Sequence, residues 1–352
     1  MKPAAAPFRM MHFTPLRYPG GKGKLAAYIK SIIKENKMMD GEYVEPYAGG
    51  AGIALELLFH EYVSRVHIND MSKPIHAFWK SILDHTETMT KLIRDTPMTV
   101  KAWDKQKKIF AKPADHSIAE LGFATFFLNR TNRSGILNGG IIGGRDQTGP
   151  WKIDARFNRV ELIGRVEAIA KMRRRICLSN MDALKFLKAK SPDWSAKTLV
   201  YLDPPYFVKG RELYDDFYRP EDHERVETFV TQNLKHKWIV SYDNVPSIRA
   251  LYKGYQQIVY GIGYSARESR EGSEIMFFSD ALKMVPLVGP FRLIRGVPMR
   301  DKSEDRFPEN EAKRRFEAAL RGSRVAAPKS AKGKPATRAK VTPKARKKRA
   351  SD

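Results

Sequence analysis

The four consecutive residues Asp203, Pro204, Pro205 and Tyr206 have types and a spacing that could do chemistry. The apolar run 199–202 before them has the length and composition of a buried strand. The two prolines end that strand, because neither can donate a hydrogen bond to a sheet. Ligands of open α/β sheets bind beyond the carboxyl ends of the strands, so this loop is a predicted binding site.

The chemistry predicted for this loop is recognition of an amine. The Asp203 carboxylate and the Pro204 carbonyl would be two acceptors on a rigid frame, which suits the two N–H bonds of an exocyclic amine on a nucleobase. Tyr206 would offer a flat ring on which a base taken out of its helix could stack. The alternative without chemistry is a strand and turn in which Asp203 caps the loop and Tyr206 packs in the core.

The glycine-rich loop 18–24 runs into a helical pattern that begins at residue 25. Such a loop presents backbone N–H groups and the positive end of a helix dipole, and Lys22 adds a charge, so it would suit a carboxylate or a phosphate. The loop is not a Walker motif, because the spacing and the Lys-Ser/Thr ending are missing. A flexible loop before an ordinary helix is the alternative interpretation.

A second glycine-rich loop, 45–52, lies between a predicted strand and a helical run at 53–62, and a further strand at 65–70 ends in Asp70. This is a βαβ unit whose glycines, Gly49 and Gly50, would let a ligand approach the backbone. An acid at the end of the second strand takes ribose hydroxyls in nucleotide-binding units. The loop is not a strict G-x-G-x-x-G, so the pattern favours an adenosine-type cofactor over a dinucleotide.

Strands and helices alternate along much of the chain, which predicts an α/β fold with a mainly parallel sheet and an antiparallel end. Residues 71–128 read mainly as helices, and helical periodicity resumes over 153–172. Further strands are predicted at 176–182, which ends in Asp182, at 238–242, and as a final pair at 257–264 and 274–279.

The segment 129–152 is rich in glycine, polar and basic, with too few apolar residues for a core of its own. Loops of this length inside a compact domain are usually functional, and Arg and Gln side chains can read base edges. A long solvated insertion is the alternative. The candidate readers are Arg130, Arg133, Arg145 and Gln147.

The chain carries a net charge of +25, and its last thirty residues, 323–352, hold eleven Lys or Arg against one Asp. The remaining 322 residues therefore keep +15, which indicates a polyanionic partner, most simply nucleic acid, although basic residues can also serve solubility alone. The single cysteine, Cys177, excludes a disulfide within the chain and a Cys-based zinc site, and we expect no metal. No run of 18 apolar residues occurs, so no membrane span is expected.

Four motifs stand in one order: Tyr18-Pro19-Gly20-Gly21-Lys22, Glu45-Pro46-Tyr47-Ala48-Gly49-Gly50, the segment from Asn129, and Asp203-Pro204-Pro205-Tyr206. Over residues 14–279 the sequence resembles the DNA adenine-N6 methyltransferases, of the type with an Asp-Pro-Pro-Tyr motif in the alpha order. The resemblance implies a Rossmann-like, S-adenosylmethionine-dependent enzyme that flips an adenine out of double-stranded DNA and methylates its exocyclic amine. It also implies a bacterial or phage protein of the cytoplasm, near the nucleoid, monomeric, with a separate restriction endonuclease as a possible partner.

The resemblance also implies roles for individual residues. The target base would be held by Asp203, Pro204 and Tyr206. The cofactor would contact Tyr18, Lys22, Glu45, Gly49, Gly50, Asp70 and Asp182.

The domain boundaries follow from the same motifs. We expect an N-terminal arm at 1–13, a catalytic domain at 14–285 with a helical, target-recognition insertion at about 71–172, and a linker with an amphipathic helix at 286–322. The Lys/Arg/Ala/Pro-rich tail 323–352 is expected to be disordered.

The segment 139–144, Gly-Gly-Ile-Ile-Gly-Gly, departs from the recognition hairpin of the family members that read GATC, so the target sequence stays open. Two alternatives remain for the function. One is methylation of another amine, at N4 of cytosine in DNA or on an RNA base, which the same motif could serve. The other is a basic DNA-binding protein that keeps the fold without catalysis.

Overall fold

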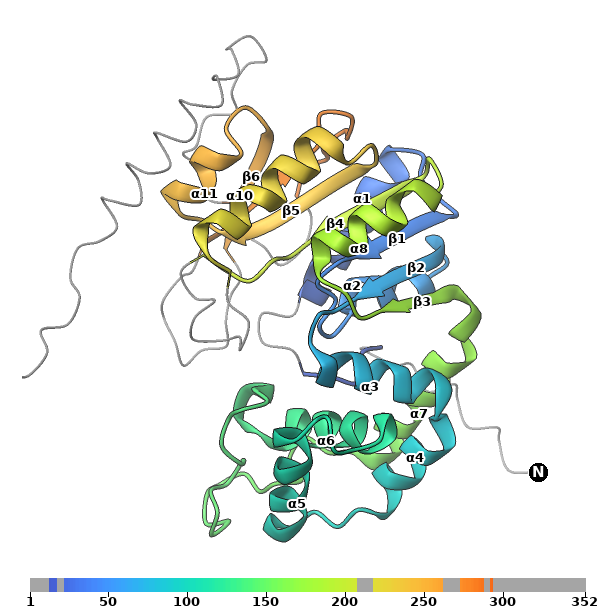
Figure 1. The fold of residues 1–352 in the computed structure, drawn as a ribbon, viewed down its shortest axis with the longest axis vertical. Coiled ribbons are helices and arrows are strands. Elements are labelled where there is room, and N and C mark those ends of the chain that lie inside the picture. The colour runs from blue at the N-terminus through green and yellow to red at the C-terminus, as the bar shows by residue number, and fades with distance from the viewer. Residues whose placement is uncertain (1–12, 18–21, 208–217, 262–272, 288–291, 294–352) are drawn as a thin grey trace, which may run out of the picture.

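A single sheet forms the centre of the computed structural model (Figure 1), which describes residues 13–17, 22–207, 218–261, 273–287 and 292–293. Within these ranges the sheet has eight strands in the order β3-β2-β1-β4-β5-β7-β6-β8. The strands are β1 (Gly41–Glu45), β2 (Val63–Asn69), β3 (Ile176–Ser179), β4 (Thr198–Leu202), β5 (Lys237–Asp243), β6 (Gln256–Gly261), β7 (Ser273–Phe278) and β8 (Arg292–Leu293).

The five strands from β3 to β5 are parallel, so their carboxyl ends meet at one edge of the sheet. Strand β7 lies antiparallel between β5 and β6. Its first residues therefore reach the same edge, where Glu274 pairs with Asp243 of β5 and with Tyr260 of β6. The predicted α/β fold with a mainly parallel sheet and an antiparallel end is confirmed, and it is consistent with an S-adenosylmethionine-dependent methyltransferase fold.

Side chains of the central strands alternate between two buried cores, as expected for a sheet covered on both faces. Tyr43 and Tyr201 belong to the core on one face, and Val44 and Val200 to the core on the other. Residues of α1 (Ala26–Glu35) and α2 (Gly52–Phe59) pack in the first core. Residues of α8 (Ala183–Lys190), α10 (Pro220–Thr228) and α11 (Pro246–Leu251) pack in the second core.

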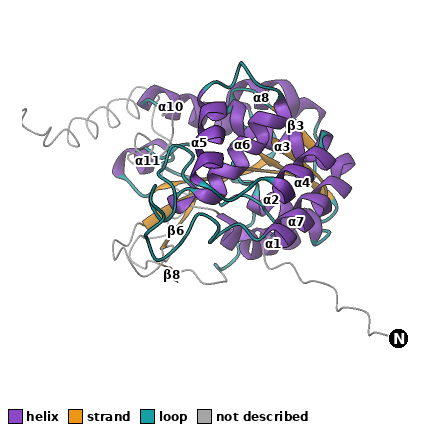
Figure 2. Ribbon diagram, turned by 90° about the horizontal axis from the view of Figure 1, so that it is seen from below, coloured by secondary structure: helices purple, strands orange, loops and turns teal. Residues whose placement is uncertain are grey.

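A group of helices lies together below the β3 and β2 side of the sheet in Figure 1, and Figure 2 shows them in front of the sheet when seen from below. They are α3 (Lys73–Asp84), α4 (Thr86–Asp95), α5 (Val100–Ala111), α6 (Ile118–Thr131) and α7 (Arg159–Lys171). We call them the helical lobe. The described chain also has short turns of helix at Lys22–Leu25, Arg133–Gly135, Arg173–Arg175, Ser191–Asp193 and Phe229–Asn233.

Helix α6 is the buried centre of the helical lobe, which explains why its sequence is apolar on almost every side. It begins with a capping box in which Ser117 and Glu120 satisfy each other's backbone N–H groups. It then packs closely on α3: a Cβ at Gly122 would lie 2.5 Å from the Ala77 carbonyl oxygen, so only glycine fits there.

The structure corrects two boundaries. Asn129 and Arg130 belong to the last turn of α6, not to the following loop. Helix α7 begins at Arg159 rather than 153, because the Asn158 side chain accepts from the Glu161 N–H and caps the helix there.

Tyr18, the loop glycines before Lys22, nearly all of the N-terminal arm, most of the segment 286–322 and the basic tail 323–352 lie outside the described residues. The domain boundaries that depend on them stay predictions. Among the residues that the structure describes, no helix is long and apolar enough to cross a membrane.

Candidate active site

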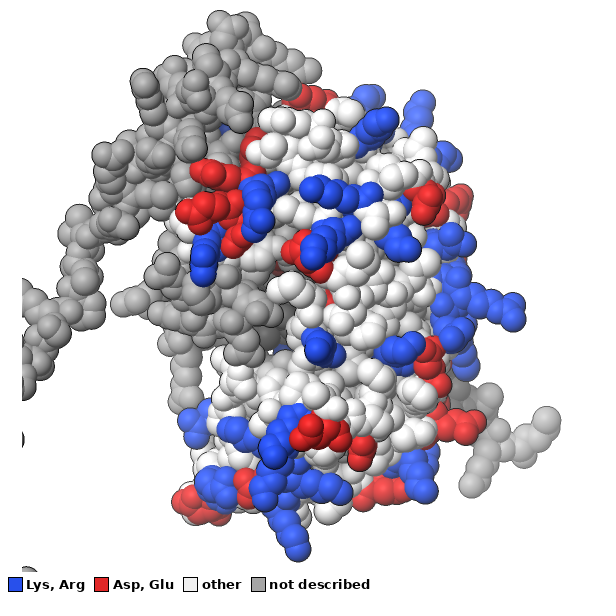
Figure 3. All heavy atoms as spheres, viewed as in Figure 1, with Lys and Arg blue, Asp and Glu red and all other residues white. Residues whose placement is uncertain are grey.

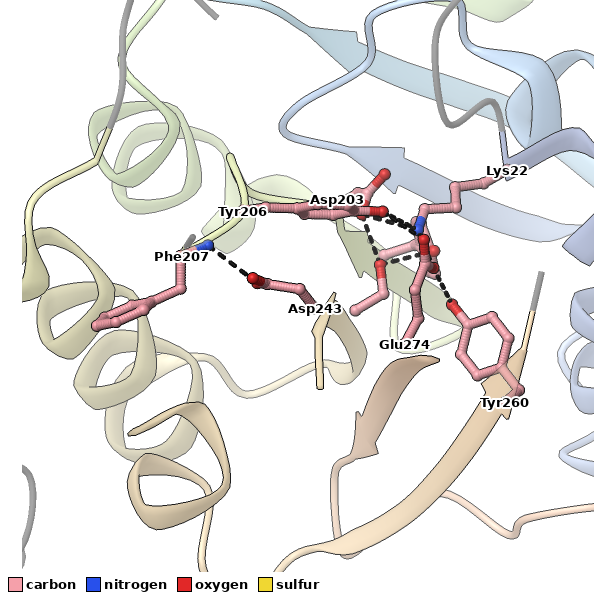
Figure 4. A network of polar contacts seen from close by, with 9 residues as sticks. Lys22, Asp203, Tyr206, Phe207, Asp243, Tyr260 and Glu274 are labelled. Atoms are coloured by element: carbon pink, nitrogen blue, oxygen red, sulfur yellow. Dashed lines mark hydrogen bonds and ion pairs between the residues drawn. The ribbon is translucent and has the colours of Figure 1, made fainter. Parts of the chain in front are cut away.

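Asp203 stands immediately beyond β4 at the carboxyl edge of the sheet, as the sequence predicts (Figure 4). Its Oδ1 accepts a hydrogen bond of 2.7 Å from the Ser241 hydroxyl on the neighbouring strand β5. Tyr201, two residues earlier on β4, lies with its hydroxyl 2.9 Å from the same Ser241 oxygen. Buried groups on two strands therefore hold this carboxylate in one orientation.

Lys22 joins the first glycine-rich loop to the Asp-Pro-Pro-Tyr motif. Its Nζ donates to the Tyr206 hydroxyl at 2.7 Å and lies 3.5 Å from Oδ1 of Asp203. It also forms an ion pair with Glu274 on β7. The Lys22 side chain is only 7% exposed, so these contacts replace most of its hydration.

Glu274 is the member of this cluster that the sequence did not predict. Its carboxylate accepts from the Tyr206 hydroxyl at 2.6 Å and from the Tyr260 hydroxyl at 2.8 Å, in addition to the Lys22 contact. In the sequence, Glu274 is only an acid at the start of an apolar run. The register of β7 against β5 and β6 brings it to Lys22 and Tyr206. We call Lys22, Asp203, Tyr206, Tyr260 and Glu274 the buried polar cluster.

One cation and two carboxylates give the buried polar cluster a formal excess of negative charge. Burial raises the pKa of Asp203 above its usual range, and the Glu274 carboxylate adds to this rise, whereas Lys22 and the Ser241 hydrogen bond oppose it. Burial also raises the pKa of Tyr206, so its hydroxyl stays protonated. The site therefore combines an acceptor of raised basicity with a neutral aromatic ring.

The second glycine-rich loop is tied back to the end of β2. Gly49 has a left-handed backbone (φ 46°), and its N–H donates to Oδ2 of Asp70 at 2.9 Å. The Trp79 indole donates to the Gly49 carbonyl at 2.9 Å, and Oδ1 of Asp70 accepts from the Ser72 N–H at 2.9 Å. Asp70 thus shapes the loop, whatever else it contacts.

Two further candidate residues along the same edge accept hydrogen bonds from the first turns of helices. Glu45 ends β1 and accepts from the Ala54 N–H at 3.1 Å, and burial raises its pKa to about 8. Asp182 follows β3 and caps α8 by accepting from the Lys185 N–H at 3.0 Å.

Asn69 connects the loops that follow β1, β2 and β3, a role that the sequence did not reveal. Its buried amide donates to the Pro46 and Met181 carbonyls, each at 3.0 Å, and accepts from the Met181 N–H at 3.0 Å. The structure thus brings Glu45, Gly49, Gly50, Asp70 and Asp182 to one edge.

Residues 18–263, more than half of the chain, match the family model of the D12 class N6 adenine-specific DNA methyltransferases. The chain belongs to this family. The enzyme class and the methylation of adenine N6 in DNA, both predicted from the motifs, are confirmed, and the family implies S-adenosylmethionine as the methyl donor in general.

A search of curated proteins gave no match to this methyltransferase. A solved structure described as a conserved hypothetical protein of Streptococcus pyogenes is 11% identical, with 69% of this chain and 88% of that chain covered and a TM-score of 0.29. That similarity is too weak to support any conclusion.

The predicted base readers of the methyltransferase have different surroundings. The Gln147 amide donates to the Ile142 and Gly144 carbonyls at 2.8 and 2.6 Å and accepts from the Ile153 N–H at 2.8 Å, so it holds its own loop together. Arg130 donates to the Arg156 carbonyl at 2.8 Å, and burial lowers its pKa to about 10. Base reading by Gln147 would need its loop to open, and Arg130, on the last turn of α6, would need to release the Arg156 carbonyl. Their roles as readers stay predictions.

The other two candidates are at the surface. Arg133 is exposed, and Arg145 forms a two-pronged ion pair with Asp104, with both N–O distances 2.9 Å. Figure 3 shows Lys and Arg gathered over the lower part of the helical lobe, with some acids among them. Trp151 is 66% exposed, and the Arg156 guanidinium lies 6.0 Å from the centre of its ring.

Proposed function

We propose that this methyltransferase binds S-adenosylmethionine along the carboxyl ends of β1, β2 and β3. The left-handed turn at Gly49 and the small residues around it favour a close approach of the cofactor to the backbone. In the first glycine-rich loop, a Cβ built at Gly23 would meet no atom of the described chain within 4 Å, so that backbone also has open space beside it. The residues that would hold the cofactor are Tyr18, Lys22, Glu45, Gly49, Gly50, Asp70 and Asp182, as the family resemblance implies.

We propose that Asp203, Pro204 and Tyr206 hold the target adenine. The observation that carries this proposal is the anchoring of Asp203: in the described chain both of its contacts, from Ser241 and Lys22, are on Oδ1. Oδ2 is then the oxygen that would accept from the adenine amine, and the Pro204 carbonyl would accept the second N–H.

The chemical demands on these residues are modest. The cofactor, when bound, supplies a methyl group that is already activated by the positive sulfur. The chain aligns the amine nitrogen and excludes water, which can supply much of a rate enhancement. The amine nitrogen gains a bond to the methyl carbon while the bond from that carbon to sulfur breaks, and the nitrogen loses a proton. Asp203, whose pKa is raised and which would accept from this amine, would take that proton.

We propose that double-stranded DNA lies across the helical lobe, with Arg133 and Arg145 as readers and the adenine turned out of the duplex. The exposed basic residues of that lobe favour phosphate contact. A monomeric state, a separate endonuclease partner and a place in the cytoplasm near the nucleoid stay predictions from the resemblance.

The test uses the full chain, labelled S-adenosylmethionine and double-stranded DNA, with the methylated nucleosides identified by mass spectrometry. N6-methyladenine is expected; N4-methylcytosine, or transfer to RNA alone, would contradict the proposal. Asp203→Ala should lose transfer but keep cofactor affinity in calorimetry. The matched control is Asp193→Ala, an exposed acid before β4, which should behave as the unaltered protein.

A further inference from the structure

Glu274 is a buried carboxylate with donors from three separate parts of the chain. Lys22 comes from the turn before α1, Tyr206 from the loop after β4 and Tyr260 from β6. Its side chain is 3% exposed. Burying a charged carboxylate costs several kcal/mol unless other groups compensate it, so these three donors explain how it is tolerated.

The position of Glu274 follows from the topology of the sheet. Because β7 runs antiparallel between β5 and β6, its second residue lies where the parallel strands end, beside Asp243. An acid at the other end of β7 would be far from the Asp-Pro-Pro-Tyr loop. Figure 4 shows Glu274 directed at Lys22 and Tyr206.

Of the three partners that Glu274 has in the described part of the chain, two are residues that the proposed function places at the cofactor and the target base. Lys22 lies between two carboxylates: it is in an ion pair with Glu274 and 3.5 Å from Asp203. Glu274 therefore shares the Lys22 charge with Asp203. It also fixes the Tyr206 hydroxyl, and with it the plane of the ring.

We propose that Glu274 is a positioning residue for methyl transfer: by holding Lys22 and the Tyr206 hydroxyl, it leaves the Asp203 carboxylate available to the substrate amine. This proposal rests on the proposed function of Asp203. Without Glu274, more of the Lys22 charge would act on Asp203, and a carboxylate paired more strongly with a cation is a weaker acceptor and a weaker base. Tyr206 would at the same time lose the acceptor that sets its ring.

The sign of the expected pH effect follows from the same geometry. Glu274 raises the pKa of Asp203 and Lys22 lowers it, so the removal of the Glu274 charge should lower that pKa. Transfer that needs ionised Asp203 would then persist to lower pH, although its plateau rate would be smaller. Among the residues that the structure describes, the titratable groups that face Asp203 or Glu274 are Lys22, Tyr43, Glu45, Tyr201, Tyr206, Asp243 and Tyr260.

The experiment compares Glu274→Gln with the unaltered full chain in single-turnover methylation of a short duplex across pH. We expect the plateau rate to fall about 10- to 100-fold and the acidic limb to move to lower pH, with dissociation constants for S-adenosylmethionine and DNA changed less than about threefold. The matched control is Glu42→Gln, a half-buried acid at the opposite edge of the sheet that contacts His67 at 3.1 Å. It should leave both the rate and the profile unchanged.

The double variant Lys22→Met, Glu274→Gln keeps the proposal testable if the single variant folds poorly. With the cation also absent, the acidic limb should move back to higher pH. A Glu274→Gln enzyme with unchanged rate and profile, beside an inactive Asp203→Ala enzyme, would overturn the role of Glu274 alone. An active Asp203→Ala enzyme would overturn the proposed site itself.

Discussion

The change Asp203→Asn separates the charge of the acceptor from its shape. Asparagine has nearly the volume of aspartate, and its carbonyl oxygen could still accept from the Ser241 hydroxyl, as Oδ1 does at 2.7 Å. The amide nitrogen would then face the substrate amine, where two donors oppose each other. Lys22 would keep Glu274 as its counter-ion, so the buried polar cluster would stay paired.

The expected loss can be estimated from the bonds that change. A hydrogen bond to a charged acceptor contributes about 1.5–3 kcal/mol, and an unmatched buried donor costs about 1–3 kcal/mol. A loss of about 3 kcal/mol in transition-state stabilisation corresponds to a rate about a hundredfold lower. We expect this loss in the single-turnover rate, because Asp203 is placed at the reacting amine and not at the cofactor.

The same change should not weaken the fold. The pKa of Asp203 is raised in the folded state, so the folded protein binds its proton more tightly than the unfolded chain does. Ionised Asp203 therefore lowers the free energy of unfolding at neutral pH. That free energy should rise as the pH falls toward the folded-state pKa of Asp203, because the carboxyl group then becomes protonated in the folded protein. Replacement by a neutral amide should leave the thermal midpoint at pH 7 unchanged or higher.

The assay is rapid-quench methylation with saturating cofactor and duplex, accompanied by thermal unfolding of the same preparation. A hundredfold slower enzyme with an unchanged or raised midpoint is the expected pair of results. A rate within threefold of the unaltered enzyme would refute the placement of Asp203 at the amine. A midpoint many degrees lower would refute the electrostatic account of its burial.

Three further predictions follow from other regions. Burial lowers the pKa of His223 to about 4, and its Nδ1 lies 3.1 Å from the Tyr242 hydroxyl. Between pH of about 6.5 and 4 the unfolded chain binds a proton at this histidine that the folded protein does not, so the free energy of unfolding should fall as the pH drops through this range. His223→Phe should flatten that decline in urea titrations. Arg145→Ala should relax the choice of target sequence in methylation sequencing without a change in thermal midpoint, whereas Asp104→Ala, which removes its ion-pair partner, should keep that choice. The same sequence specificity in the two variants would exclude Arg145 as a reader. Deletion of 323–352 should reduce the slope of log affinity against log salt for DNA and leave the target sequence unchanged; an unchanged slope would mean that the tail does not contact DNA.

Local patterns were sufficient to predict the sheet and the Asp-Pro-Pro-Tyr loop. Apolar runs that end in prolines, glycines or acids mark the carboxyl ends of buried strands, and parallel strands bring these ends together. For this reason Asp203 and Asp70 could be assigned to one edge from their places in the chain. The helical lobe was predicted by the same reasoning from its periodicity.

What the sequence could not show depends on register and on competing hydrogen bonds. Glu274 meets Lys22, 252 residues away, only because β7 enters between β5 and β6, and no local pattern encodes that pairing. Gln147 has the composition of a base reader, but nearby carbonyls satisfy its amide first. Asn69 is an ordinary polar residue in the sequence, and its importance comes from three loops that meet around it.

The insertion of β7 between β5 and β6 also bears on when an active enzyme first exists during synthesis. Ribosomes release the chain from its N-terminus, so the glycine loops, the Asp-Pro-Pro-Tyr motif and β6 all emerge before Ser273. Until then, the edge of β5 that pairs with β7 is open. Glu274 is also absent, so the ion pair between Glu274 and Lys22 cannot form. Assembly of the catalytic centre is therefore tied to closure of the sheet, and a nascent chain would acquire both together.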